Sequence, residues 1–278
     1  MGINIKSNAK LNLGLKILNR RADGYHNIHT IMQEIDIYDT IELSITKSKK
    51  ITLSTSGIPT PNDQNNLCYK AAKLFLEAYN ISNGVHIKLN KHIPIGAGLG
   101  GGSSNAANTL KGLYDLFNIS IDNDTINILC AKLGADVPFF IKGGIQLSEG
   151  IGHDLKPITS LADNIYFLII YPDIEISTSW AYSEYKNYLE NTSIQTNFMP
   201  LSDRINWSLL ENDFEKVVLS TYPKISQIKD CLIESGSLFA SLSGSGSTMF
   251  GVYDNLELVN NVQTIFKEHQ IYNALPVH

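Results

Sequence analysis

Cysteine is scarce in this chain of 278 residues, and the three cysteines, Cys68, Cys130 and Cys231, lie far apart. No CxxC pair is present, and none of the seven histidines forms a zinc-binding pattern with cysteine or with another histidine. We therefore expect neither a disulfide framework nor a structural zinc site, and a reducing cytosol is the expected setting.

Long apolar runs and a basic excess are also missing. The densest apolar run, Tyr166–Tyr171, is far shorter than the ~20 residues that span a bilayer, and Met1–Lys10 is polar, unlike a signal peptide. Lys plus Arg number 22 against 27 Asp plus Glu, a formal charge of −5. A nucleic-acid binder normally carries a basic stripe, whereas a short cluster such as that around Lys49 is typical of solvated surface. We expect neither a membrane nor nucleic acid among the partners.

The chain carries an α+β pattern of elements, with antiparallel hairpins rather than a regular βα alternation. The expected strands are Lys10–Leu18, Ile28–Ile37, Asp39–Ile45, Ile51–Ser54, Val85–Leu89, Ile165–Tyr171, Leu238–Leu242, Thr248–Tyr253 and Tyr272–Pro276. The expected helices are Leu67–Tyr79, the segment behind Ser104, Asp124–Leu133, about Asp203–Ser220, Ile225–Ser235 and Leu256–His269, with an irregular segment after Tyr171. A composition change near residues 155–163 is the best candidate boundary, which predicts lobes at residues 1–158 and 159–278.

A glycine-rich segment stands directly before one of the expected helices. Five glycines occur among the eleven residues Pro94–Ser104, and residues 106–117 then present an apolar helical face. Glycine lets backbone N–H groups converge on an anion, and a helix N-terminus adds unpaired N–H groups and the positive end of its dipole. A flexible connector is the alternative, but such a linker would not run straight into an amphipathic helix. The segment predicts a phosphate-binding loop, at whose end Ser103 and Ser104 bond backbone, phosphate or a metal ion.

Three familiar classes of phosphate loop do not fit this context. No GxxxxGK[ST] string is present, which excludes a Walker loop. Gly96, Gly98 and Gly101 match GxGxxG, but a dinucleotide fold needs an acidic residue at the end of the next strand, and the segment after Asp122 is helical in pattern. A protein-kinase loop fails because no HRD or DFG element follows.

The string Pro94-Ile-Gly-Ala-Gly-Leu-Gly-Gly-Gly-Ser-Ser104 resembles the second motif of the GHMP kinases, the family of galactokinase, homoserine kinase and mevalonate kinase. Two more segments resemble motifs of that family in the expected order, Ala9-Lys-Leu-Asn-Leu13 near the start and Leu242-Ser-Gly-Ser-Gly-Ser247 near the end. The resemblance implies a two-lobed GHMP kinase fold, with a ribosomal protein S5 domain 2-like N-terminal lobe and a ferredoxin-like C-terminal lobe. In this family the third motif returns to the phosphate site beside the second.

The resemblance also implies ATP-dependent phosphoryl transfer to an alcohol. From the residues alone, Asp136 is either a turn residue between a helix and an apolar run or a carboxylate held for chemistry. Lys10 lies on an alternating strand, where a buried lysine needs an anionic partner unless it snorkels to the surface. The resemblance pairs the two as catalytic residues: Asp136 accepts the hydroxyl proton, and Lys10 orients it and stabilises the developing charge.

The resemblance assigns further residues to the nucleotide, which it implies to be ATP with Mg²⁺. The expected metal contact is Ser103 or Ser104. Asn65, in the loop before the first helix, is expected near the adenine. The expected ATP-binding residues are Asn65, Pro94, Ile95, Gly96, Ala97, Gly98, Leu99, Gly100, Gly101, Gly102, Ser103, Ser104, Gly244, Ser245 and Gly246.

Three longer strings resemble in particular the branch of the family that acts on diphosphocytidyl-methylerythritol in the non-mevalonate route to isoprenoids. The strings are Arg21–His26, Gly100–Ala107 and Leu133–Phe140. The resemblance implies transfer of the ATP γ-phosphoryl group to the 2-hydroxyl of that substrate. It places Tyr25 and a second aromatic, Tyr182, on the two faces of the cytosine, with His26 at its edge. The alternative is that Tyr25 only covers the Gly24 turn and His26 caps it. The expected substrate-binding residues are Asn12, Tyr25, His26, Thr178 and Tyr182.

Two rival functions remain. One is a GHMP kinase for another alcohol, such as homoserine or mevalonate, but a small aliphatic substrate needs no aromatic cradle. The other is a non-catalytic GHMP-fold binding protein, which has no reason to keep both Lys10 and Asp136. Two departures from the family pattern, Asp173 in place of Gly and His92 in place of Lys or Arg, bear on nucleotide affinity and on the cytidine pocket. The expected partners are ATP and the small-molecule substrate, with the protein a monomer or weak homodimer in the cytoplasm.

Overall fold

The computed structural model describes residues 2–152, 154–158, 164–190 and 205–278, and the chain in it divides into two compact units. The first unit comprises Met1–Ala9, Ile37–Ile95 and Gly100–Lys142, and the second comprises Lys10–Asp36, Gly96–Leu99 and Gly143–His278. Neither unit is one continuous stretch, since the chain passes several times from one to the other. The expected boundary at residues 158 and 159 lies inside the second unit. The lobes 1–158 and 159–278 stay a prediction.

The sheet of the first unit is built on the second half of β2 (His26–Thr46). There β2 pairs antiparallel with β4 (Gly84–Lys91), from Thr40 opposite Asn90 to Thr46 opposite Gly84, and β4 pairs in parallel with β3 (Thr52–Gly57). The long strand β1 (Gly2–Arg20) also pairs with β2. The expected break between two strands near residue 38 is wrong, because Asp39 continues the strand with its carboxylate buried.

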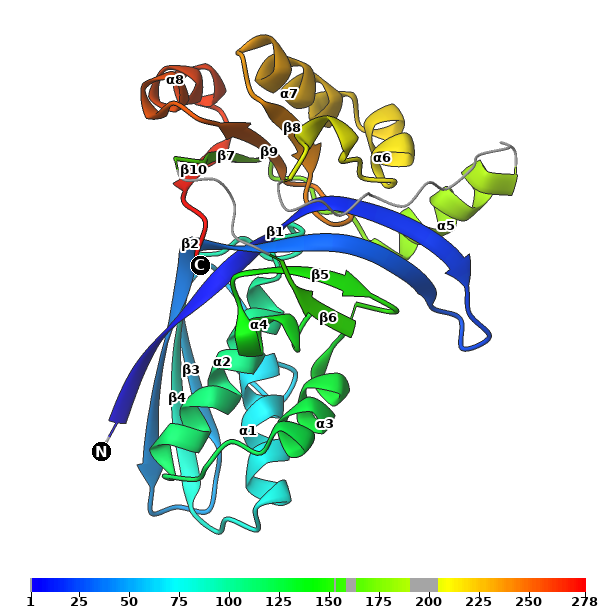
Figure 1. The fold of residues 1–278 in the computed structure, drawn as a ribbon. Coiled ribbons are helices and arrows are strands. Elements are labelled where there is room, and N and C mark those ends of the chain that lie inside the picture. The colour runs from blue at the N-terminus through cyan, green and yellow to red at the C-terminus, as the bar shows by residue number, and fades with distance from the viewer. Residues whose placement is uncertain (1, 153, 159–163, 191–204) are drawn as a thin grey trace. The chain divides into compact units, whose positions relative to one another are not determined.

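Four helices complete the first unit, and Figure 1 shows α1, α2 and α3 together on one side of β3 and β4. They are α1 (Leu67–Ala78), α2 (Gly101–Leu116), α3 (Asn123–Leu133) and the short α4 (Phe139–Lys142). The Asn66 and Asp122 side chains accept hydrogen bonds from the first turns of α1 and α3, which fixes where those helices begin. Phe75 of α1 packs against the rings of Tyr79 and Tyr114, so aromatic contacts join α1 to α2.

The second unit contains a four-stranded antiparallel sheet in the order β10-β7-β9-β8. Its strands are β7 (Tyr166–Tyr171), β8 (Phe239–Leu242), β9 (Met249–Tyr253) and β10 (Gln270–Ala274). Helix α7 (Pro223–Glu234) precedes β8, and α8 (Leu256–Val262) lies between β9 and β10. Numbered in chain order, the strands run 4-1-3-2 across the sheet, which is the ferredoxin-like arrangement expected for this part of the chain.

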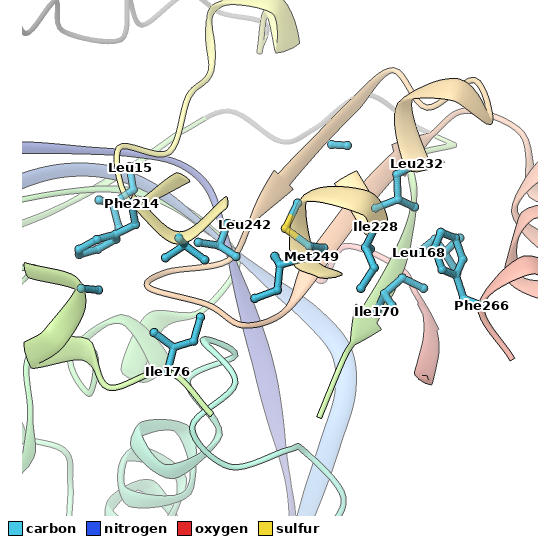
Figure 2. Packing of buried hydrophobic residues seen from close by; sticks show 14 of the residues in the cluster. Leu15, Leu168, Ile170, Ile176, Phe214, Ile228, Leu232, Leu242, Met249 and Phe266 are labelled. Carbon is cyan, nitrogen blue, oxygen red and sulfur yellow. The ribbon is translucent and has the colours of Figure 1, made fainter. Parts of the chain in front are cut away.

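The core of this unit lies between the sheet and its helices, as Figure 2 shows. Leu168 and Ile170 of β7 lie in the same cluster as Ile228 and Leu232 of α7, and Phe266 belongs to it as well. Each such side chain contributes about 1.5–3 kcal/mol when it leaves water, so one apolar face of the sheet is enough to hold the helices. Phe167 and Ile169, which point to the opposite face of β7, are buried as well, so this strand is covered on both faces.

Several elements of the second unit differ from expectation. The segment after Tyr171 contains α5 (Thr178–Glu190), whose Ala181 and Tyr185 are buried one helical turn apart. A hairpin of β5 (Ile145–Glu149) and β6 (Asp154–Pro157) was not foreseen, and β5 pairs with the first half of β2.

The helix expected over residues 203–220 is also wrong. Residues 203 and 204 lie outside the described residues, and the rest forms a 3₁₀ turn (Trp207–Leu209) and then α6 (Glu215–Thr221). Asn212 instead pairs with Leu15 of β1, which holds the chain extended between the two elements. The last expected helix ends at Val262 and continues as a 3₁₀ turn (Gln263–Phe266). Among the described residues, no helix combines the length and apolar character that crossing a bilayer requires.

Candidate active site

Three of the sequence motifs meet at one backbone carbonyl in the second unit. The carbonyl oxygen of Gly98 accepts a hydrogen bond from the Lys10 ammonium group at 2.8 Å and another from the Ser243 hydroxyl at 2.9 Å. The Lys10 ammonium group also donates to the Asn12 side chain, and the Asn12 backbone N–H donates to Ser243 Oγ at 3.3 Å. Lys10 is 3% exposed. The structure thus brings the first, second and third motifs together around Gly98.

Only glycine fits at position 98. Its φ of +80° lies in the left-handed region, and an added Cβ would overlap the carbonyl oxygen of Ser243. The close approach of the Gly98 and Ser243 backbones puts the Ser243 hydroxyl within hydrogen-bonding distance of the Gly98 carbonyl. A second hydrogen bond, from Thr248 N–H to the Ala97 carbonyl at 3.3 Å, ties the third motif to the same part of the loop.

The third motif also contacts residues that were expected to hold the substrate. The hydroxyl groups of Thr178, at the start of α5, and Ser245 lie 2.9 Å apart. On its other side the motif is held by Asn212, whose amide nitrogen donates to the carbonyl oxygens of Leu242 at 2.7 Å and Gly244 at 2.8 Å. Sequence reasoning missed Asn212 because it lay inside an expected helix. Asn212 and Asp213 both have low helix propensity, and this pair could have indicated a break in the expected helix.

Two of the expected cytidine contacts stack on each other. The rings of His26 and Tyr182 lie 5.0 Å apart between centroids with an interplanar angle of 11°, and Phe214 meets the edge of Tyr182 at 4.9 Å. Burial and the nearby charge of Arg20 lower the pKa of His26, so its ring is neutral at neutral pH. Tyr25 is 63% exposed at the tip of the turn. The structure brings His26 and Tyr182 together and leaves Tyr25 in solvent.

The end of the glycine loop and the start of α2 lie in the first unit. Gly100 is the N-cap of α2, and because it has no side chain, the first N–H groups of the helix are left for another acceptor. The exposed Gly102 lies against Leu67, since an added Cβ would be 3.4 Å from that side chain. The N-termini of α1 and α2 are therefore neighbours. Asn65 is exposed and lies just before α1.

The two serines of the loop differ in their surroundings. Ser104 is fully buried, and its hydroxyl lies 2.8 Å from the hydroxyl of Ser7 and 3.3 Å from the amide nitrogen of Asn108. Ser103 is half-buried, and its hydroxyl lies 4.0 Å from where a Cβ of Gly134 would stand. Ser104 is thus engaged in packing α2 against β1, which leaves Ser103 as the better candidate for a ligand contact.

Asp136 is half-buried in the turn between α3, which ends at Leu133, and α4. Because Gly134 of the same turn lies beside Ser103, the turn stands next to the first turn of α2. The pairing of Asp136 with Lys10 stays a prediction. Within the described ranges of the chain, no group of three or more His, Cys, Asp or Glu side chains could hold a metal ion.

The two departures from the family pattern have visible surroundings. Asp173 adopts a φ of +56°, a left-handed conformation that glycine takes at no cost and that Asp tolerates better than most residues. His92 is exposed and its backbone N–H donates to the Asp39 carboxylate at 2.7 Å.

Comparison with known proteins identifies the family to which this arrangement belongs. Residues 66–144 match the N-terminal domain of the GHMP kinases, and residues 196–271 match the C-terminal domain of the same family. The 4-diphosphocytidyl-2-C-methyl-D-erythritol kinase of Chlorobium limicola is 40% identical over 272 residues, 96% of this chain and 93% of that protein. The corresponding protein of Chlorobaculum parvum is 41% identical over 262 residues, 92% of this chain and 91% of that protein.

Solved structures agree with the sequence relatives. A crystal structure of 4-(cytidine 5'-diphospho)-2C-methyl-D-erythritol kinase has a TM-score of 0.84 and 29% identity, covering 99% of this chain and 100% of that one. Homoserine kinase from Cytophaga hutchinsonii shares the fold with a TM-score of 0.73 at 18% identity, covering 99% of this chain and 95% of that one. The expected α+β GHMP kinase fold is confirmed. The chain belongs to the GHMP kinases and, among them, to the family of 4-diphosphocytidyl-2-C-methyl-D-erythritol kinases.

Proposed function

We propose that this protein transfers the γ-phosphoryl group of ATP to the 2-hydroxyl of 4-diphosphocytidyl-2-C-methyl-D-erythritol, giving the 2-phosphate and ADP in the non-mevalonate route to isoprenoid precursors. The observation that carries this choice of substrate is the stack of His26 on Tyr182, backed by Phe214. A flat aromatic surface with a neutral imidazole edge suits a nucleobase. Homoserine and mevalonate offer no ring to use it.

The nucleotide phosphates would be held by backbone rather than by side chains. The N–H groups at the uncapped start of α2 supply donors and the positive end of the helix dipole. In the second unit, the Gly98 carbonyl oxygen already accepts hydrogen bonds from Lys10 and Ser243. We assign the adenine to the N-terminal end of α1, where Asn65 directly precedes the helix and Leu67 lies against Gly102 of α2.

In the transfer, the substrate 2-hydroxyl oxygen forms a bond to the γ-phosphorus while the bond to the β,γ-bridging oxygen breaks, and ADP leaves with that electron pair. The hydroxyl proton passes to the carboxylate of Asp136. Lys10 stabilises the charge that develops on the alkoxide and on the moving phosphoryl group. Because the transition state of phosphoryl transfer is loose, positioning contributes more than the base does.

Magnesium accompanies ATP in reactions of this class and neutralises charge on the β- and γ-phosphates. The hydroxyl groups of Ser103 and Ser104 lie at the end of the loop and are oxygen donors of the kind that would contact this ion. Of the two serines, we assign the contact to Ser103, because the Ser104 hydroxyl is buried against Ser7.

The test is ADP release from Mg-ATP with three alcohols: the diphosphocytidyl substrate, homoserine and mevalonate. We expect ADP with the first alone and a loss of about 100-fold or more in kcat for Asp136→Ala, the size typical of a general base. Tyr182→Ala should raise KM for the diphosphocytidyl substrate, whereas the control Tyr272→Ala, on β10, should not. Turnover of homoserine or mevalonate would overturn the substrate assignment, and silence with all three from protein that binds ATP would favour a binding role.

A further inference from the structure

The buried carboxylate of Asp39 is surrounded by donors in the first unit. Its Oδ2 accepts hydrogen bonds from Lys91 Nζ at 2.5 Å and from the side-chain amide of Asn105 at 2.8 Å. Its Oδ1 accepts the backbone N–H groups of His92 at 2.7 Å and Ile93 at 2.9 Å. Asp39 is 0% exposed and Lys91 3% exposed. Four donors thus satisfy one carboxylate that has no contact with water.

The four donors lie at the two ends of the glycine loop. His92 and Ile93 directly precede Pro94, where the loop begins, and Asn105 stands in the first turns of α2, where the loop has ended. Asp39 itself belongs to neither end, because it lies in β2. One carboxylate on a strand therefore fixes both ends of the loop against the sheet.

Lys91 reinforces the connection at the second end. An added Cβ at Gly101 would lie 2.7 Å from Lys91 Nζ, so the ammonium group packs directly on the first residue of α2. A positive charge beside the positive end of a helix dipole is unfavourable unless an anion accompanies it, and Asp39 is that anion. Burial lowers the pKa of Lys91, and the charge of Asp39 opposes that shift.

The network reaches a second strand through Asn105. The amide nitrogen of Asn105 donates to Ser7 Oγ at 2.9 Å, and Ser7 in turn contacts Ser104. All of these side chains are buried. Buried ion pairs add little net stability compared with apolar packing of the same volume, so stability alone does not explain an ion pair at this position. The need to hold the loop in one geometry does explain it.

We propose that Asp39 is a positioning residue for the nucleotide: with Lys91 and Asn105 it holds the two ends of the glycine loop in the arrangement in which the N–H groups of α2 meet the ATP phosphates. This inference rests on the proposed function of that loop in ATP binding. Asp39 acts through the loop and touches neither substrate. Its loss should weaken binding of ATP while the alcohol substrate binds as before.

The test separates the two ends of the loop. In Asp39→Asn the remaining oxygen can still accept from His92 and Ile93, but the new amide faces the Lys91 ammonium group and the Asn105 amide, donor against donor. The double variant Asp39→Asn with Asn105→Asp exchanges amide and carboxylate and restores a donor–acceptor pair. The probes are a non-hydrolysable ATP analogue with Mg²⁺, measured by calorimetric titration, and the steady-state KM for each substrate.

We expect Asp39→Asn to weaken analogue binding and to raise KM for ATP about tenfold, with KM for the alcohol unchanged, and the exchanged pair to recover most of the loss. The control is Phe75→Leu, a core change in the same unit that lowers stability without touching the network. If Asp39→Asn loses stability as Phe75→Leu does and binds the analogue like the parent, the pair is structural only and the proposal is wrong. Should Asp39→Asn fail to fold, Asn105→Ala, which keeps the ion pair, decides in the same way: undiminished analogue binding overturns the proposal.

Measurements on the protein without substitutions separate this positioning role from the proposed function on which it rests. A parent that binds no ATP analogue would overturn both. A parent that binds the analogue and releases ADP, with Asp39→Asn and Asn105→Ala binding equally well, would overturn the positioning role alone.

Discussion

The imidazole of His26 lies flat on the phenol ring of Tyr182, with 5.0 Å between ring centroids and 11° between the planes. The two residues come from different parts of the second unit, the start of β2 and the first turns of α5. Each of these rings has a flat aromatic face, and such faces make stacked contacts with other flat rings. The protonation state of His26 then decides whether its edge can accept a hydrogen bond.

Replacing Arg20 should raise the pKa of His26. Burial and the charge of Arg20 both lower this pKa in the folded protein, and Arg20→Gln removes only the second cause. The pKa should therefore rise towards its ordinary value and remain below it. The measurement is an NMR titration of the His26 ring protons. Arg21→Gln is the matched control, because Arg21 pairs with Asp23 at 2.9 Å, and an equal rise in both variants would contradict the assignment to Arg20.

The same shift has a consequence for stability. Since the pKa of His26 is lowered on folding, the unfolded chain binds a proton more readily than the folded one as the pH falls through its ordinary value near 6.5. Stability should therefore fall as the pH drops through that range and be regained above it. The pKa values of His29 and His269 are lowered as well, so His26→Gln should reduce the difference in the free energy of unfolding between pH 5.5 and pH 7.5 without abolishing it. Urea denaturation at the two pH values measures this difference. An unchanged difference would contradict the prediction.

Replacing Ser104 should lower stability, whereas replacing Ser103 should weaken the binding of Mg-ATP. Ser104→Ala removes a buried hydroxyl that contacts Ser7 and Asn108, which should lower the free energy of unfolding by about 1–3 kcal/mol. Ser103→Ala should leave that free energy within about 0.5 kcal/mol, because the Ser103 side chain is only half-buried whereas Ser104 is fully buried, and it should raise KM for Mg-ATP. Urea denaturation and steady-state kinetics on both variants check this. A purely structural Ser103 would leave KM unchanged.

The motifs of this site were predictable because each is local. The run of glycines and the helix that follows it can both be recognised from neighbouring residues, and α2 begins where that pattern predicts, while phosphate binding stays a prediction. The positions of Lys10 and Asn12 on one strand follow from its alternation. The caps at Asn66, Asp122 and Gly134 agree with the helix ends that the sequence predicts.

The parts that escaped prediction depend on residues far apart in the chain. A break between two strands was expected at residue 38, directly before Asp39. The strand continues because the donors at positions 91 to 93 and 105 make the Asp39 carboxylate acceptable inside the first unit. Helix α5 is rich in aromatic and polar residues, so its pattern is weak, and Ala181 and Tyr185 are apolar partners only for a core that the sheet supplies. Tertiary contact overrode local pattern in both cases.

Alanine at Gly98 should be far more harmful than alanine at Gly102. Gly98 has a φ of +80° and an added Cβ would overlap the Ser243 carbonyl, whereas Gly102 is helical and exposed, and a Cβ added there would be 3.4 Å from the Leu67 side chain. We expect Gly98→Ala to cost about 2 kcal/mol or more in stability, from strain and overlap together. Gly102→Ala should change stability by less than about 1 kcal/mol, since alanine favours the helix. Denaturation midpoints compare the two, and equal losses would contradict the geometry at Gly98.

Asn212 should prove necessary for the conformation of the third motif, although it lies about 30 residues before that motif in the sequence. Its buried amide nitrogen donates to the carbonyl oxygens of Leu242 and Gly244, and its own oxygen accepts from Phe214 N–H at 3.0 Å. Asn212→Ala leaves these groups without their partner inside the protein, a loss of about 1–3 kcal/mol per buried group left unsatisfied. Because Gly244 and Ser243 then lose a fixed position, kcat/KM for ATP should fall as well. The control Asn206→Ala removes an asparagine that only caps the 3₁₀ turn at Ser208 and should leave kcat/KM unchanged. If Asn212→Ala lowers stability but keeps the kcat/KM of the unmodified protein, the third motif holds its shape through its contacts with Gly98, Asn12 and Thr178, and Asn212 is an anchor for β1 rather than a support of the site.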